Sequence, residues 1–281
     1  MKLGDTRQSS NVQDRRGGGG KRAGVALSGG TIVLVLVVSA ITGKNPLTLL
    51  GEMSGGQQTS AASRSGAPVD PNDPGAVFTR KVLATTEDAW SEALPRMGAR
   101  YVEPTLVLFR DGVESACGFQ EAAVGPFYCP GDQMAYIDLE FFDELQKKLG
   151  AEGDFAAGYV IAHEVGHHVQ KLLGESDRVR AAGKDKGPTG NAVRLELQAD
   201  CYAGVWGAHV KKKGILEIGD IDEALGAATA IGDDTLQRRA KGRVTPESFS
   251  HGTGEQRVRW FKKGMESGDP KACDTFAAAS L

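Results

Sequence analysis

The pattern of apolar and polar positions divides the chain into four segments. Residues 1–22 are polar, basic and rich in glycine, a composition typical of a disordered segment. Residues 23–42 contain no charged residue and are long enough to cross a bilayer as a helix. Gly, Ser, Gln, Pro and Asn dominate residues 43–75, which indicates a flexible linker. Residues 76–281 mix apolar and polar positions and are long enough to form one domain with a substantial core.

Within this domain the spacing of apolar residues predicts helices and a few short strands. The expected fold class is therefore α+β, mainly helical with a small β-sheet. We expect Asp154 and Asn191 to be the N-caps of two long helices. The predicted elements are a helix over 76–94, strands over 104–109 and 134–138, helices over 139–149, 155–173 and 192–212, and a polar loop over 174–190.

The helix over 155–173 carries the motif H-E-x-x-H. His163 and His167 are four residues apart, so both imidazoles lie on one helix face and point to one place. Two such ligands and an open position suit Zn²⁺, and the neighbouring Glu164 is placed to act as general base. Apolar residues surround the helix, which indicates burial, and buried histidines need a partner such as a metal. The alternative is a core helix whose histidines are hydrogen-bonded to neighbours.

The second long helix supplies two acids four residues apart, Glu196 and Asp200, which share one helix face. Two histidines leave a catalytic zinc one protein ligand short, and Glu196 is the best candidate for it. Asp200 is placed to accept a hydrogen bond from a ligating imidazole. The alternative is a pair of solvated surface acids, which the apolar neighbours argue against. In the motif helix, Gly166 suggests close backbone approach. We interpret His168 as a residue that packs in the core or supports a ligand, and not as a ligand itself.

Charge and hydropathy indicate export of the domain. Residues 1–22 carry six Lys/Arg and two Asp, a net charge of +4. Because the whole chain has a net charge of -3, the remainder has a net charge of -7. A negatively charged domain does not have the basic surface that binds nucleic acid. The basic flank of the 23–42 segment is expected in the cytoplasm, with the domain on the other side. One alternative is a cleaved signal peptide, because Val38-Ser39-Ala40 resembles a cleavage site. Another is a core helix, but no nearby chain could cover it.

Four cysteines allow three pairings. Cys117 and Cys129 are close in sequence and lie across an expected hairpin. Pairing of Cys201 with Cys273 would tie the acid-bearing helix to the C-terminal part of the chain. Disulfides suit an exported domain, whereas free buried cysteines and zinc ligands remain as alternatives. No C-x-x-C spacing supports a structural zinc site.

Short segments along nearly the whole chain carry a resemblance to a known family: SSNVQDRRG at 9–17, ACG at 116–118, GPFYCPGD at 125–132, YVIAHEVGHHVQ at 159–170, ELQADCYAGVW at 196–206, IGDD at 231–234, FSHGTGEQRVRWF at 249–261 and ACDTF at 272–276. With these segments the chain resembles the neutral zinc metallopeptidases of the bacterial membrane-anchored type. The half that carries the zinc motif also resembles gluzincins, in which a later helix supplies a glutamate ligand and, four residues on, an aspartate that orients the first histidine.

The resemblance implies a zincin-like metallopeptidase domain with one Zn²⁺ per chain. His163, His167 and Glu196 would be the ligands, Glu164 the general base, and Asp200 the partner of the first histidine. Zinc would lower the pKa of its bound water and polarise the scissile carbonyl. The base would take the water proton and pass it to the leaving amine.

His251 resembles the gluzincin histidine that stabilises the oxyanion, although helix capping or solvent contact is an equal alternative. We also expect Arg257 to pair with an acid near the site, and the strand over 134–138 to be a sheet edge that binds extended peptide.

The expected function is hydrolysis of a peptide or protein substrate at a bacterial cell membrane, and the sequence indicates no particular protein partner. The alternatives are a non-catalytic, zinc-stabilised extracytoplasmic binding module, which the intact Glu164 argues against, and a metal-dependent hydrolase of non-peptide bonds.

Overall fold

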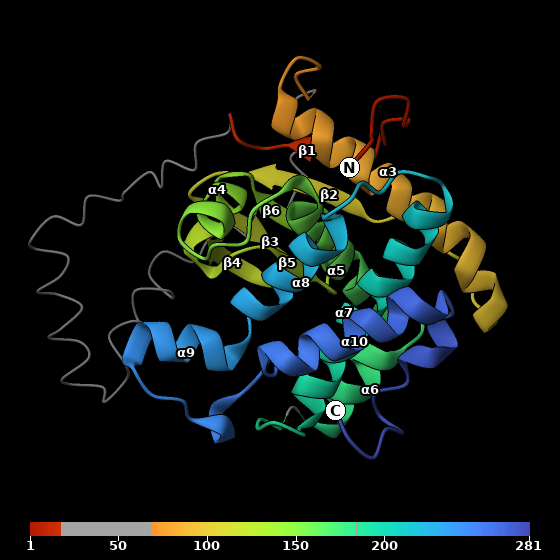
Figure 1. Ribbon diagram of the computed structural model, residues 1–281. Helices are drawn as coiled ribbons and strands as arrows, with labels where there is room; N and C mark the ends of the chain where they lie inside the picture. Colours follow the sequence, from red (N-terminus) through yellow and green to blue (C-terminus); the bar gives the residue numbers. More distant parts are fainter. Residues whose placement is uncertain (18–68, 184) are drawn as a thin grey trace, which may run out of the picture. The chain divides into compact units, whose positions relative to one another are not determined.

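The described part of the chain comprises residues 1–17, 69–183 and 185–281 of a computed structural model (Figure 1). The predicted transmembrane helix over 23–42 lies outside these residues, as does most of the predicted linker. None of the described helices is long and apolar enough to cross a membrane. In chain order the helices and strands are β1 (Val12–Asp14), α3 (Pro74–Ala93), β2 (Thr105–Phe109), β3 (Gly112–Ser115), β4 (Gly118–Glu121), β5 (Phe127–Cys129), β6 (Met134–Asp138), α4 (Glu140–Lys147), α5 (Asp154–Leu172), α6 (Glu175–Ala182), α7 (Asn191–Lys212), α8 (Asp220–Ala230), α9 (Asp233–Lys241) and α10 (Gly254–Ser267).

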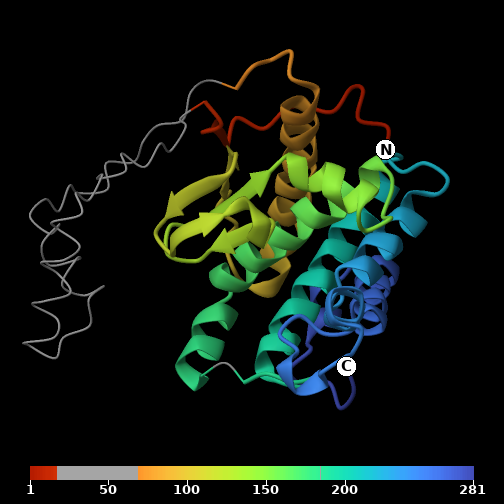
Figure 2. The same cartoon turned by 90° about the vertical axis from the view of Figure 1, so that its left-hand side faces the viewer.

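The fold is α+β and mainly helical, as the sequence predicts, with a four-stranded sheet on one side of α5 and helices α7 and α10 on the other (Figure 2). The strand order is β1-β2-β6-β5, and only β5 is antiparallel to its neighbour. Strands β2 and β6 are almost fully buried, as expected for parallel strands covered on both faces. Because β6 is hydrogen-bonded on both sides, the expectation that residues 134–138 form the sheet edge is wrong. The short strand β5 forms that edge.

The first 17 residues pack against the domain, which corrects the expectation of disorder for this part of residues 1–22. Strand β1 extends the sheet by parallel pairing with β2. Glu87 on α3 gives a physical reason for this order, since its buried carboxylate accepts hydrogen bonds from Ser9 (2.5 Å) and Asn11 (2.9 Å). Arg7 adds an ion pair of 2.8 Å. A buried charge requires such partners, and all three come from the N-terminal segment.

Two glycines let the central helices approach closely. A Cβ atom added at Gly166 of α5 would lie 3.0 Å from the backbone oxygen of Ala199 on α7 and 3.1 Å from its Cα. Helices α10 and α7 also approach each other closely, because a Cβ atom added at Gly264 of α10 would lie 1.9 Å from the backbone oxygen of Cys201 on α7. Because glycine has no side chain, the helix backbones can come into contact at these points. The close backbone approach predicted from Gly166 is thus confirmed. Helix α7 is thereby held between α5 and α10.

Most predicted elements are present, with one clear difference. The helices expected over 76–94, 139–149 and 192–212 correspond to α3, α4 and α7. The segment 174–190, expected to be a loop, contains helix α6. Only Val179 of this helix is buried, so its sequence shows no apolar stripe from which a helix could be predicted.

The starts of the two ligand-bearing helices also differ from prediction. Gly153 precedes α5 and Asp154 is already helical, so Asp154 is not the N-cap. The backbone N–H of Phe155 instead donates to Glu223 of α8 at 2.9 Å. Asn191 is likewise the first residue of α7, and its side chain bonds to the preceding loop rather than capping the helix.

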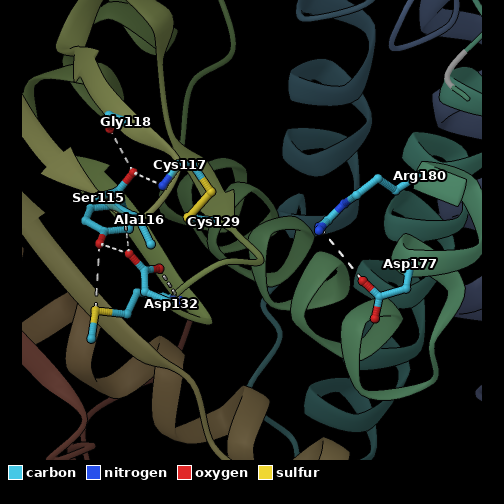
Figure 3. Close-up of a disulfide and its surroundings, with 10 residues drawn as sticks. Ser115, Ala116, Cys117, Gly118, Cys129, Asp132, Asp177 and Arg180 are labelled. Carbon is cyan, nitrogen blue, oxygen red and sulfur yellow. Dashed lines mark hydrogen bonds and ion pairs between the residues drawn. A yellow bond between two sulfur atoms is a disulfide. The ribbon is translucent and has the colours of Figure 1, made fainter.

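Both expected disulfides are confirmed. Cys117 and Cys129 join the turn of the β3–β4 hairpin to the end of β5, and we call this bond the hairpin disulfide (Figure 3). Cys201 and Cys273 join α7 to the C-terminal part of the chain, and both are fully buried. The described chain contains no free cysteine.

Candidate metal centre

Three side chains from two helices meet at one place. His163 and His167 lie one turn apart on α5, and Glu196 lies on α7, which packs against α5 at Gly166. Oε2 of Glu196 is 3.3 Å from Nε2 of His163 and 3.5 Å from Nε2 of His167. All three donor atoms lie within 4.8 Å of one another. Two imidazole nitrogens and one carboxylate oxygen are a donor set of catalytic zinc sites.

Asp200 holds the other ring nitrogen of the first histidine, because its Oδ1 lies 2.8 Å from Nδ1 of His163. The same carboxylate accepts hydrogen bonds from Tyr159 (2.5 Å) and from Arg257 (2.9 and 3.0 Å). Arg257 is thus paired with an acid of the site. Burial alone would raise the pKa of Asp200, but Arg257 and His163 hold it below its usual value. Asp200 is therefore an anion that orients His163 through its Nδ1 proton.

Gln170 plays the corresponding part for the second histidine. Its Oε1 lies 2.9 Å from Nδ1 of His167, one turn away on α5, and the glutamine side chain is fully buried. An amide oxygen only accepts, so Nδ1 of His167 carries the proton and Nε2 is its unprotonated nitrogen. Sequence reasoning missed Gln170, although its spacing of three residues places it near His167 on the helix.

The donor set fits a zinc ion. Among the described residues, only Glu196 lies within bonding reach of either Nε2 atom. Burial lowers the pKa of His163, but the carboxylates of Asp200 and Glu196 outweigh it and raise that pKa to about 9. The site therefore favours a positive charge at this point, which a divalent cation would supply in place of a proton.

Glu164 follows the first histidine ligand on α5. The side chain is 6% exposed and lines the cavity over the site. Burial raises the pKa of this carboxyl group. No hydrogen bond or ion pair joins it to another residue of the described chain, so it is free to accept a proton from a reacting group.

His251 lines the same cavity from the loop before α10. Asp233, at the start of α9, holds this loop, because its Oδ2 accepts the backbone N–H groups of residues 250–252 at 2.7 to 3.1 Å. Its Oδ1 lies 3.2 Å from Nδ1 of His251. The charge of Glu196, and then Asp233, raises the pKa of His251, which favours its hydrogen-bond-donating form. The part played by Asp233 depends on a loop folding back onto α9, which no local pattern in the sequence indicates.

A cavity of about 530 Å³ opens over these residues. Its lining includes apolar side chains such as Phe127 of β5, Phe141 of α4 and Ile231. Arg180 of α6 also lines it, and Figure 3 shows this side chain pointing toward the hairpin disulfide. A cavity of this size, lined by both apolar and polar side chains, can accommodate a small molecule or part of a peptide.

His168 points away from the ligands, as predicted for a packing residue. Its Nε2 lies 2.7 Å from the backbone oxygen of Val102 and therefore donates. Its Nδ1 accepts a hydrogen bond from the hydroxyl of Tyr128 at 2.9 Å. These bonds connect α5 to β5 and to the loop before β2.

The donor set of His163, His167 and Glu196 could hold a metal ion, and its chemistry suits zinc. The chain belongs to the family described as "Putative neutral zinc metallopeptidase", whose model matches residues 1–276. "Uncharacterized protein YpfJ" of Escherichia coli strain K12 is 48% identical over 281 residues, with 96% of each chain covered. "Uncharacterized protein Rv2575" of Mycobacterium tuberculosis strain H37Rv is 44% identical over 215 residues, covering 72% of this chain and 71% of the relative. No solved structure matches the chain.

Proposed function

We propose that this protein is a zinc-dependent peptidase that hydrolyses peptide bonds in the cavity over His163, His167 and Glu196. The observation that carries the proposal is the unpaired carboxylate of Glu164 beside three converging donor atoms at the wall of a cavity. A structural zinc site is closed by four protein ligands and needs neither a free base nor a cavity. These features therefore favour a peptidase over a zinc-stabilised binding module.

The protein groups divide the chemistry between them. Zinc held by the three ligands would supply a Lewis acid that polarises the scissile carbonyl and acidifies water. Glu164 takes a proton from the attacking water and passes it to the leaving amine, and its raised pKa suits both steps. His251 donates a hydrogen bond to the developing oxyanion. Asp200 and Arg257 keep the first histidine in one orientation throughout.

Strand β5 provides a place for an extended peptide. It is the edge of the sheet, and Phe127 and Tyr128 on it line the cavity. A peptide or protein segment bound along this edge would pair with the strand through its backbone and place alternate side chains in the cavity. β5 thus takes the part first expected of β6.

Replacing Glu164 with Gln tests the proposal. We expect the variant to retain zinc and to lose cleavage by about 10² to 10⁴-fold, the usual contribution of a general base. The assay incubates purified full-length protein with a mixture of unstructured peptides and detects products by mass spectrometry.

Glu144→Gln is the matched control, because Glu144 lines the same cavity but is exposed and paired with Lys148. Cleavage by Glu164→Gln at the wild-type rate would refute the assignment of the base. A zinc-loaded wild type that cleaves nothing would favour the binding module.

We propose further that the domain lies on the extracytoplasmic face of a bacterial cell membrane, associated with it through residues 23–42. Two disulfides support this location, because such bonds persist in oxidising compartments. The uncharged sequence of residues 23–42 supports the association with the membrane.

A further inference from the structure

A line of hydrogen bonds connects His167 to the C-terminal part of the chain. Gln170, whose Oε1 faces the histidine, donates through Nε2 to the backbone oxygen of Leu195 at 2.6 Å and to Oε1 of Gln198 at 3.1 Å. Gln198 in turn donates through Nε2 to the backbone oxygen of Cys273 at 3.2 Å. Both glutamines are buried, at 0% and 4% exposure. The line therefore runs from α5 across α7 to the C-terminal segment without reaching solvent.

Only one orientation of the two amide groups satisfies this line. Backbone carbonyls only accept, so Leu195 and Cys273 each require an NH₂ group opposite them. This requirement turns Oε1 of Gln170 toward His167 and assigns the imidazole proton to Nδ1. A reversed amide would place two donors or two acceptors against each other in a buried site, which costs free energy. The two backbone carbonyls thus determine that the nitrogen of His167 facing Glu196, Nε2, is the one without the proton.

We propose that Gln170, Gln198 and the backbone carbonyl of Cys273 are positioning groups for the zinc ligand His167. They fix its tautomer and its ring orientation, so that Nε2 is presented to the metal. The C-terminal segment is in this way part of the metal centre, and the disulfide between Cys201 and Cys273 holds it against α7. The inference rests on the zinc site of the proposed function and does not depend on peptide hydrolysis. Loss of such an outer partner typically weakens metal binding tenfold to a hundredfold.

Zinc affinity of the purified full-length protein, measured by competition with a chromophoric chelator, tests this proposal. We expect Gln170→Met to bind zinc about tenfold to a hundredfold more weakly than the wild type, and Gln198→Met to be weakened in the same direction. Because the two groups act in series, the double variant should bind no more weakly than Gln170→Met alone. Thr275→Val is the matched control, since Thr275 is fully buried and its hydroxyl joins the same segment to Arg194 of α7 outside this line.

A second readout separates positioning from general destabilisation. The absorption spectrum of the Co²⁺-loaded protein reports ligand geometry, and it should change in Gln198→Met but not in Thr275→Val. If Gln198→Met does not fold, Gln198→Glu replaces it, because its carboxylate still accepts from Gln170 but cannot donate to Cys273. The proposal is overturned if Gln198→Met and Thr275→Val bind zinc equally well, or if the two glutamine effects multiply in the double variant. A wild type without zinc would refute the metal site itself, whereas absent peptide cleavage would leave this inference intact.

Discussion

The two histidine ligands are held by different kinds of partner. Nδ1 of His163 faces the anionic Asp200, which is itself bound to Arg257. Nδ1 of His167 faces the neutral amide of Gln170. The acid partner could be predicted, because Glu196 and Asp200 share one face of α7 and the resemblance to gluzincins implies an aspartate four residues after the glutamate ligand. The amide could not, because a glutamine in a helix most often lies on the surface and only the tertiary structure shows its burial.

A third histidine, His168, should make stability depend on pH. Burial lowers its pKa below the ordinary value of 6.5, so the unfolded chain takes up a proton that the folded chain resists. Its contribution to stability is therefore complete above pH 6.5 and is lost progressively as the pH falls from 6.5 through the lower pKa of the folded state. The free energy of unfolding should fall less between pH 8 and pH 5 in His168→Gln than in the wild type. Chemical denaturation with a chelator present at both pH values measures this difference. An equal fall in both proteins would contradict the buried, neutral assignment of His168.

At the scale of elements, the crossing of α5 over α7 determines the geometry of the site. The helices carry the ligands on facing sides, and Gly166 lies between the two histidines at the point where their backbones meet. The position of Glu196 relative to the imidazoles therefore depends on the absence of a side chain at one residue. This dependence could be anticipated from the sequence, because a glycine inside a buried helix is otherwise unfavourable.

Gly166→Ala should destabilise the protein by about 1–3 kcal/mol, despite the higher helix propensity of alanine, because the new methyl group would press on the backbone of Ala199. It should also weaken zinc binding, since the helices must separate. Gly226→Ala in α8 is the control, because no atom lies within 4 Å of the added Cβ, and it should stabilise by about 0.5–1 kcal/mol. Thermal unfolding of both variants measures the effects. A Gly166→Ala protein as stable as Gly226→Ala would refute the close contact.

Three of the elements that the sequence did not predict are short or lack an apolar stripe of their own. Strands β1 and β5 have three residues each, too few for an alternating pattern, and they exist because β2 and β6 offer them a partner. Helix α6 has one buried residue and no apolar stripe. The long helices and the buried strands, by contrast, carry their pattern within their own sequence.

At the scale of the whole molecule, the N-terminal segment raises a question of membrane topology. A helix over 23–42 that crossed the bilayer once would place residues 1–17 and 69–281 on opposite faces. The pairing of β1 with β2 and the contacts of Glu87 require them on the same face. We therefore expect the N-terminal segment to be extracytoplasmic together with the domain, in place of the cytoplasmic location first expected.

Cysteine labelling tests this topology. Gln8→Cys and Glu255→Cys each introduce an exposed thiol, one in the N-terminal segment and one in the domain. Both should react with a membrane-impermeant maleimide on spheroplasts as completely as after lysis, because both are expected on the outer face. Reaction of Gln8→Cys only after lysis, with Glu255→Cys reactive throughout, would show that β1 does not pair with the domain in the membrane.

The proposed peptidase function and the proposed positioning of His167 both depend on zinc at His163, His167 and Glu196, so the most direct measurement is the metal content of the purified full-length chain. A second cluster, Asp220 and Glu223 with a neighbouring aspartate, also has the spacing of a metal site, which makes it the natural comparison. We predict one zinc per chain in the wild type and in Glu223→Gln, and none after dialysis in Glu196→Ala. Zinc retained by Glu196→Ala but lost from Glu223→Gln, or a wild type that binds none, would contradict the metal centre described above.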